Sequence, residues 1–185
     1  RDPEDVDLTW EIDAYRFDLP VMASAMDGVV SPDSAVAIGK LGGLAVLNLE
    51  GLWTRYEDTE AIFNEIASLP PEKATLRMQE IYLEPIKPEL IGQRIREIKS
   101  AGVVAAGSLT PQRTTMYLDE VLKAELDVLV IQGTVVTAEH KSKNHEPLNL
   151  KQVIRDLPIP AIVGGCASYD AALHLMRAGA AGVLV

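Results

Sequence analysis

Small polar side chains gather where short apolar runs of the sequence end, and these residues have the clearest capacity for chemistry. The residues that follow the first five runs are 24–28, 48–51, 108–110, 132–134 and 166–168. Most of them are small, neutral and able to form hydrogen bonds, which suits a ligand rich in polar groups, such as a nucleotide. Within this set the carboxylates are Asp27 and Glu50 and there is no histidine, which argues against strong acid–base catalysis.

Three of the reactive residue types have ordinary structural interpretations. Cys166 is the single cysteine, and we interpret it as a buried small apolar residue because no basic neighbour in sequence would activate its thiol. Asp27 either ends a turn together with Gly28 or contacts a ligand, and the residues leave both open. His140 and His145 are five positions apart, which is not the spacing of a helical metal site. We therefore predict no metal site, and a solvated loop over residues 139–145.

The apolar runs themselves predict a parallel sheet. They cover residues 19–24, 44–47, 103–107, 128–131, 161–165 and 180–185. The runs are continuous rather than alternating, which is typical of strands that are buried on both faces. Amphipathic helical segments separate them, so the chain is predicted to be α/β, built from right-handed βαβ units.

Two α/β folds fit this alternation: an open doubly wound sheet and a (β/α)₈ TIM barrel. A doubly wound dinucleotide fold should carry a G-x-G-x-x-G motif after an early strand, and the sequence has none. Six strands with the last one uncovered favour a barrel of which this chain supplies about the first six strands. The residues favour the incomplete barrel without excluding the open sheet.

Helix boundaries can also be predicted from capping residues. Ser31 and Thr110 each precede a proline, which predicts a helix start capped by the side-chain oxygen. Ser168 is predicted to cap a later helix that turns Leu175 and Met176 inward.

One connection, over residues 53–102, is longer than a simple barrel crossover. It contains two predicted helical segments, around 60–69 and 89–100, and a proline-punctuated middle at 84–88. We predict a single barrel domain over 1–185, truncated at its C-terminal end, with this extended connection.

Composition limits the partners. The formal net charge of −10 would repel a phosphate backbone, so nucleic-acid binding is not expected. No stretch is long and apolar enough to predict a membrane span, and one cysteine fits a reducing compartment, so we expect a cytoplasmic protein. The chain begins with Arg1 rather than Met and ends within an apolar run, so we expect it to be part of a longer protein.

Four ordered motifs carry a resemblance to a known family. They are LPVMASAMD at 19–27, LGGLAVLN at 41–48, IVGGCA at 162–167 and AGAAGV at 178–183. In this order they resemble the IMP dehydrogenase/GMP reductase family. The stretches at 48–58 and 78–82 are most similar to the IMP-dehydrogenase-related paralogues that lack the CBS domain pair. The 53–102 connection lies where that pair would be inserted in the parent enzymes.

The resemblance implies a (β/α)₈ barrel, commonly a homotetramer, that binds a purine mononucleotide (IMP, XMP or GMP) and NAD or NADP. In the family a cysteine attacks C2 of the purine and a hydride passes to or from the cofactor. Its loop, with a monovalent cation, would follow Val185, so no catalytic residue is expected in this chain and Cys166 is not that cysteine. The matched positions imply substrate contacts at Ser24, Met26 and Asn48. They imply cofactor contacts at Gln132, Gly133, Thr134 and Cys166.

Three positions depart from the family pattern on the cofactor side. Gln132 replaces an aspartate, Cys166 replaces an asparagine, and Leu184 stands where a basic residue is usual. The first functional hypothesis is oxidation of IMP to XMP with NAD, in guanine nucleotide (GMP) biosynthesis. The alternatives are reduction of GMP to IMP with NADPH, a purine-nucleotide-binding regulator without turnover, and an unrelated phosphate-binding barrel.

Overall fold

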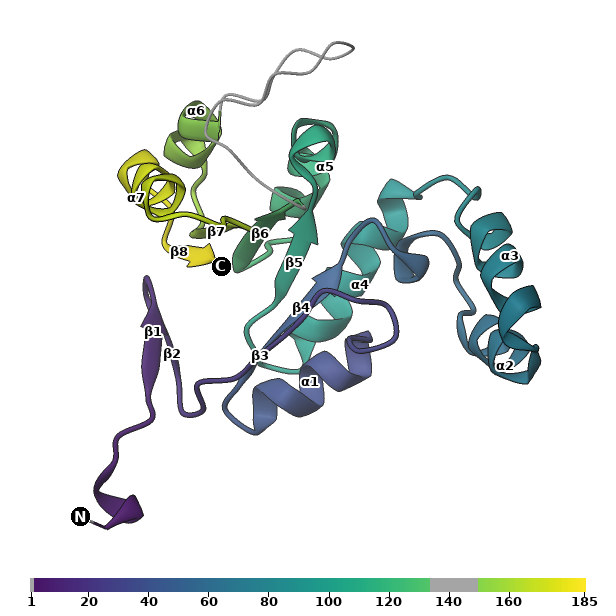
Figure 1. The fold of residues 1–185 in the computed structure, drawn as a ribbon, viewed down its shortest axis with the longest axis horizontal. Helices are drawn as coiled ribbons and strands as arrows, with labels where there is room; N and C mark the ends of the chain where they lie inside the picture. Colours follow the sequence, from purple (N-terminus) through teal and green to yellow (C-terminus); the bar gives the residue numbers. More distant parts are fainter. Residues whose placement is uncertain (1, 134–149) are drawn as a thin grey trace.

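The fold is built on a curled sheet of six parallel strands, seen in a computed structural model that describes residues 2–133 and 150–185 (Figure 1). The strands are β3 (Met22–Ala23), β4 (Leu44–Asn48), β5 (Ala106–Leu109), β6 (Val128–Gln132), β7 (Ala161–Gly164) and β8 (Gly182–Leu184). Each strand pairs with the next one along the chain, from β3 to β8. A doubly wound sheet would reverse this order at its middle, so the unbroken order confirms the incomplete (β/α)₈ barrel.

Helices link the consecutive strands. They are α1 (Pro32–Lys40), α2 (Glu60–Ser68), α3 (Pro71–Ile81), α4 (Pro88–Ser100), α5 (Pro111–Lys123), α6 (Leu150–Asp156) and α7 (Tyr169–Ala178). In the described part of the chain each crossover holds one helix, except that α2, α3 and α4 all lie between β4 and β5. The predicted helices around 60–69 and 89–100 correspond to α2 and α4, whereas α3 was not predicted.

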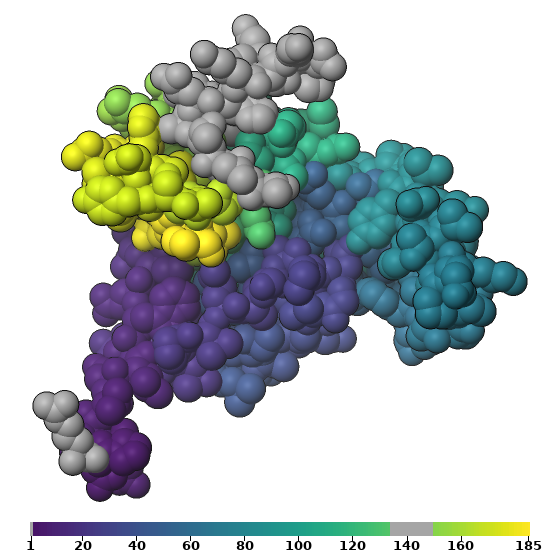
Figure 2. Space-filling view, viewed as in Figure 1, coloured from purple at the N-terminus to yellow at the C-terminus, as the bar shows by residue number. Residues whose placement is uncertain are grey.

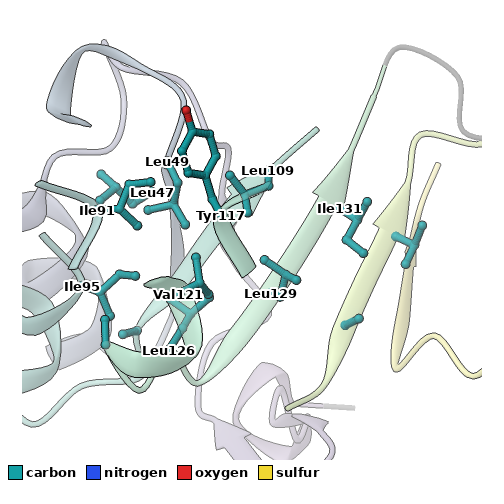
Figure 3. Packing of buried hydrophobic residues seen from close by; sticks show 14 of the residues in the cluster. Leu47, Leu49, Ile91, Ile95, Leu109, Tyr117, Val121, Leu126, Leu129 and Ile131 are labelled. Atoms are coloured by element: carbon teal, nitrogen blue, oxygen red, sulfur yellow. The ribbon is translucent and has the colours of Figure 1, made fainter. Parts of the chain in front are cut away.

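Hydrophobic packing holds the helices against the sheet. Figure 3 shows Ile91 and Ile95 of α4 and Val121 of α5 packed beside Leu47 and Leu129 of the strands. These side chains are almost wholly buried, and each contributes about 1.5–3 kcal/mol of transfer free energy. The apolar face predicted for residues 91–98 is therefore the face that fixes α4 on the sheet.

A short antiparallel hairpin, β1 (Trp10–Ile12) and β2 (Tyr15–Phe17), covers part of the other face of the sheet. Ile12 and Phe17 form a second buried cluster with strand residues such as Val46 and Val130. This hairpin was not predicted from the sequence, because its strands are only three residues long.

The hairpin is fastened at the amino ends of the strands. The Tyr15 hydroxyl donates to Asp127 Oδ1 at 3.2 Å, and Lys99 Nζ donates to the same oxygen at 2.7 Å. Asp127 Oδ2 accepts from the backbone N–H of Ala105 at 2.9 Å. Burial, and then the charge of Asp127, raises the pKa of the Tyr15 hydroxyl, so it remains a donor at neutral pH. The hairpin therefore leaves the opposite, carboxyl end of the sheet uncovered.

The part of the 53–102 connection that precedes α4 projects from the sheet (Figures 1 and 2). A 3₁₀ turn, η2 (Leu52–Thr54), begins it, and the pair α2 and α3 forms its outer part. Arg77 on α3 bonds Glu65 on α2 at 2.7 Å, which joins the two helices. Among these two helices, Ile81 is the one buried residue, so the outer part packs lightly on the rest of the chain.

Several predicted boundaries were wrong by a few residues. The strand predicted at 103–107 begins later, at Ala106, and ends at Leu109. The chain turns at Gly102, which has a positive φ, and the Ala105 N–H donates to the Asp127 carboxylate and not to a neighbouring strand. Ser108 therefore lies inside β5 and not after it. Asn48 likewise belongs to β4.

The predicted caps had a mixed outcome. Ser31 and Ser168 cap their helices, accepting from the backbone N–H groups of Ser34 and Ala171 respectively. The Thr110 side chain makes no capping bond. The backbone N–H of Thr110 donates to the Glu50 carboxylate. Met176 is exposed and not inward, because the buried face of α7 runs through Leu175 and Ala178.

Candidate functional site

Polar side chains from three neighbouring strands meet at the carboxyl end of the sheet. Asn48 and Ser108 are directly paired in the parallel register of β4 and β5. Gln132, the last residue of β6, follows on the next strand and is exposed. Parallel strands bring their carboxyl ends to one edge, which is where barrel proteins bind ligands.

A cavity of about 530 Å³ opens at this edge. Its lining includes residues of β3 and of β8, so the sheet curls until its two outermost strands face the same space. Four of the predicted contact residues line it: Ser24, Gln132, Gly133 and Cys166. The structure thus brings the predicted substrate residue Ser24 together with three predicted cofactor residues.

A second, smaller cavity of about 290 Å³ lies beside the first. Asn48 and Ser108 line it together with Glu50, and Gln132 lines both cavities. The Asn48 side-chain oxygen accepts from the Glu50 N–H at 3.1 Å, which fixes the amide plane at the end of β4. Its NH₂ group is thereby directed away from that bond and keeps its donor capacity at the cavity wall.

Of the remaining predicted contact residues, one lies outside these cavities and the other lies outside the described residues. Met26 lines neither cavity and is 54% exposed, on the turn that follows β3. Thr134 lies outside the described residues, as does the predicted loop at 139–145.

Cys166 is 4% exposed and belongs to the main hydrophobic cluster, which confirms its interpretation as a buried residue. Its N–H donates to the carbonyl oxygen of Leu184 at 2.9 Å. In residues 2–133 and 150–185, no group of three His, Cys, Asp or Glu side chains is placed to hold a metal ion. Over the same ranges, no helix has both the length and the apolar composition to cross a bilayer.

Glu50, one of the two strand-end carboxylates, is bound within the protein. Its Oε2 lies 3.3 Å from Arg113 Nε on α5, and its Oε1 accepts from the Thr110 N–H. The side chain is largely buried, so the ion pair is less screened than a surface pair. Glu50 therefore fixes the start of α5 against the end of β4.

Asp27, the other carboxylate, is bound by the connection and not by the strands. Its Oδ2 accepts from the Leu52 N–H at 2.8 Å and from the Tyr82 hydroxyl. Its backbone carbonyl accepts from Trp53 Nε1 at 3.4 Å. Asp27 Oδ1 is buried beside Gly51 and, among the described atoms, has no hydrogen-bond partner.

Tyr82 and Arg55 are site neighbours that sequence reasoning missed. The Arg55 guanidinium lies over the Tyr82 ring, 5.4 Å from its centroid, and donates to the Tyr82 carbonyl at 3.2 Å. Burial first, and then the hydrogen bond to Asp27, raises the pKa of the Tyr82 hydroxyl, with Arg55 acting in the opposite direction. Tyr82 is separated from Asp27 by 55 positions, and no local pattern in the sequence indicates the contact.

A curled parallel sheet with helices on its crossovers, and cavities at the strand carboxyl ends, places the chain in the class of (β/α)₈-barrel proteins. Within that class the chain belongs to the IMP dehydrogenase/GMP reductase family, whose domain model matches residues 2–185.

Relatives and a solved structure agree with this membership. Uncharacterized oxidoreductases of Mycobacterium tuberculosis and Mycobacterium leprae are 44% and 43% identical over 190 aligned positions. The alignments cover all of this chain and 51% of each relative. A crystal structure described as an IMP dehydrogenase/GMP reductase-like protein from Corynebacterium glutamicum is 41% identical, with a TM-score of 0.93. That match covers the whole chain and 50% of the solved one, so the chain spans about half the length of these proteins.

Proposed function

We propose that the full-length protein is a purine nucleotide oxidoreductase of the IMP dehydrogenase type, which converts IMP to XMP with NAD. The single observation that carries this proposal is the cavity of about 530 Å³ at the strand carboxyl ends, lined by Ser24, Gln132, Gly133 and Cys166. Neutral hydrogen-bonding groups in a cleft of this size suit a nucleotide. Membership of the family supplies the class of reaction.

In this proposal the substrate contacts are Ser24, Met26 and Asn48. The Ser24 hydroxyl can donate to or accept from the nucleotide at the cavity wall, and the Asn48 NH₂ group can donate at the neighbouring cavity. Met26, exposed one residue before Asp27, offers an apolar surface for the flat purine ring.

The cofactor side consists of Gln132, Gly133, Thr134 and Cys166. A nicotinamide cofactor presents ribose hydroxyls and a carboxamide, and the exposed Gln132 amide offers both a donor and an acceptor to such groups. Gly133 leaves room for close approach, because it carries no side chain. The residues therefore fit a neutral part of NAD or NADP, and the bound cofactor would supply hydride transfer.

The remaining properties follow from the family resemblance. We propose that the protein is a cytoplasmic homotetramer with a role in guanine nucleotide synthesis. The family's cysteine loop, with its monovalent cation, would lie in the half of the protein that this chain does not span. The contribution of this chain is to bind and orient the two ligands.

The test is cofactor absorbance with the full-length protein, measured with IMP plus NAD and separately with GMP plus NADPH. We expect reduction of NAD in the first mixture. Oxidation of NADPH in the second mixture alone would assign GMP reduction instead. Silence in both mixtures, with nucleotide binding intact, would contradict the oxidoreductase and identify a purine-binding regulator.

A further inference from the structure

The turn that follows β3 is bound to the long connection through the side chain of Asp27. This turn, residues 24–30, is held internally by bonds from the N–H groups of Val29 and Val30 to the Met26 carbonyl, both 2.9 Å long. Its one acidic side chain, Asp27, accepts hydrogen bonds from the Leu52 N–H and the Tyr82 hydroxyl. Both belong to the segment between β4 and β5.

The base of that connection is itself firmly closed. Arg55 donates to the Glu50 carbonyl at 3.0 Å where the connection leaves β4, and to the Tyr82 and Glu84 carbonyls where it returns. The Tyr56 hydroxyl donates to the Ile81 carbonyl at 2.9 Å. One guanidinium thus joins the two roots of the connection, and Tyr82 extends from this closed base toward Asp27.

The Asp27 carboxylate has little alternative support. Its Oδ1 is buried without a partner in the described part of the chain, and Gly51 lies directly against it. An ionised carboxylate that is partly buried needs its remaining hydrogen bonds, because each one to a charged group is stronger than a neutral bond. Among the described residues, loss of the Tyr82 hydroxyl would leave the Leu52 N–H as the single donor to this carboxylate.

We propose that Tyr82 is a positioning residue of the nucleotide site: through Asp27 it fixes the turn that carries Ser24 and Met26. The base of the long connection then helps to position the nucleotide site, because Tyr82 bonds the turn at Asp27, while α2 and α3 extend outward (Figure 1). The identity of the ligand rests on the function proposed above, whereas the mechanical link between Tyr82 and the turn does not.

Two conservative variants of the full-length protein separate positioning from general stability. Tyr82→Phe removes the hydroxyl that reaches Asp27 and keeps the ring beneath Arg55. Tyr56→Phe is the matched control, because its hydroxyl bonds the Ile81 carbonyl inside the same connection and does not touch the turn. Hydrogen exchange of peptides spanning residues 22–30 reports on the turn whether or not the protein turns over substrate.

We expect Tyr82→Phe to speed exchange at Val29 and Val30 about tenfold, as loss of one hydrogen bond to a carboxylate predicts. Tyr56→Phe should leave these amides unchanged. Unchanged exchange in Tyr82→Phe, or an equal increase in both variants, would overturn the proposal.

Nucleotide kinetics give a second, independent readout. Where wild type turns over IMP, Tyr82→Phe should raise KM about tenfold with a smaller change in kcat. The same substitution in an Asp27→Ala background should add nothing, because Tyr82 acts through that carboxylate. Additive effects in the double variant would refute the link. If wild type binds no purine nucleotide, the function proposed above fails, and hydrogen exchange alone decides the role of Tyr82.

Discussion

Replacing Gly51 with alanine should displace the substrate turn. A Cβ added at Gly51 would lie 1.9 Å from Asp27 Oδ1 and 2.5 Å from Asp27 Cγ. Non-bonded heavy atoms rest near 3.5 Å, so the carboxylate must retreat by about 1 Å or more. The bond from the Leu52 N–H, now 2.8 Å, would then exceed hydrogen-bonding distance, and the bond from Tyr82 would be lost with it.

The cost can be estimated from these lost contacts. Overpacking of a well-filled site costs about 1–3 kcal/mol, and a misplacement of about 1 Å near a reacting group can lower the rate by roughly a hundredfold. We therefore expect Gly51→Ala to lower the unfolding free energy by about 2 kcal/mol and to weaken IMP turnover by tenfold or more.

Gly28→Ala is the matched control, because a Cβ at Gly28, directly after Asp27, meets nothing within 4 Å. Chemical denaturation and steady-state kinetics of the full-length variants provide the comparison. Equal stability and equal activity for Gly51→Ala and Gly28→Ala would refute the placement of Asp27 against Gly51.

Three further outcomes follow from the structure. Ile95→Ala, on the buried face of α4, should lower the unfolding free energy by about 2–5 kcal/mol because it leaves a cavity. Equal urea midpoints for variant and wild type would contradict this packing. Ser168→Ala removes the side-chain acceptor for the Ala171 N–H and should cost about 1 kcal/mol in the same titration, whereas no change would mean that the cap contributes nothing. Burial and the charge of Asp127 raise the pKa of the Tyr15 hydroxyl in the folded protein. The contribution of Tyr15 to stability is therefore complete below the unfolded pKa of 10.0 and is lost as the pH rises through the folded pKa. Unfolding followed from pH 8 upward should therefore show stability falling above pH 10.0, less steeply in Tyr15→Phe, and identical profiles would count against the Tyr15–Asp127 contact.

The order of strands and helices could be predicted because each signal is local. Continuous apolar runs identify strands buried on both faces, and the periodicity of Ile91, Ile95 and Ile98 identifies the face of α4. The β1–β2 hairpin was missed because three-residue strands carry no detectable alternation. The start of β5 was misplaced because the Asp127 side chain, 22 positions away, decides where pairing begins.

The site was predictable only in part, for the same reason. Ser24, Gln132, Gly133 and Cys166 share a cavity because parallel strands end at one edge, which sequence order alone implies. The contact of Tyr82 with Asp27 depends on how a connection of some fifty residues folds back, and no spacing in the sequence encodes it. Sequence reasoning also left Asp27 undecided between a turn residue and a ligand contact, whereas its side chain faces the connection.

The central claim, that the carboxyl edge of this sheet holds a purine nucleotide, is tested most directly by calorimetric titration of IMP into the full-length protein and four variants. Ser24→Ala and Met26→Ala alter the proposed contacts. Ser100→Ala and Met116→Ala are matched exposed controls on α4 and α5. We expect the first pair to weaken IMP binding about fivefold to tenfold, and the controls to bind as wild type does. Unchanged affinity in both Ser24→Ala and Met26→Ala, or a wild-type protein that binds no IMP, would contradict the account.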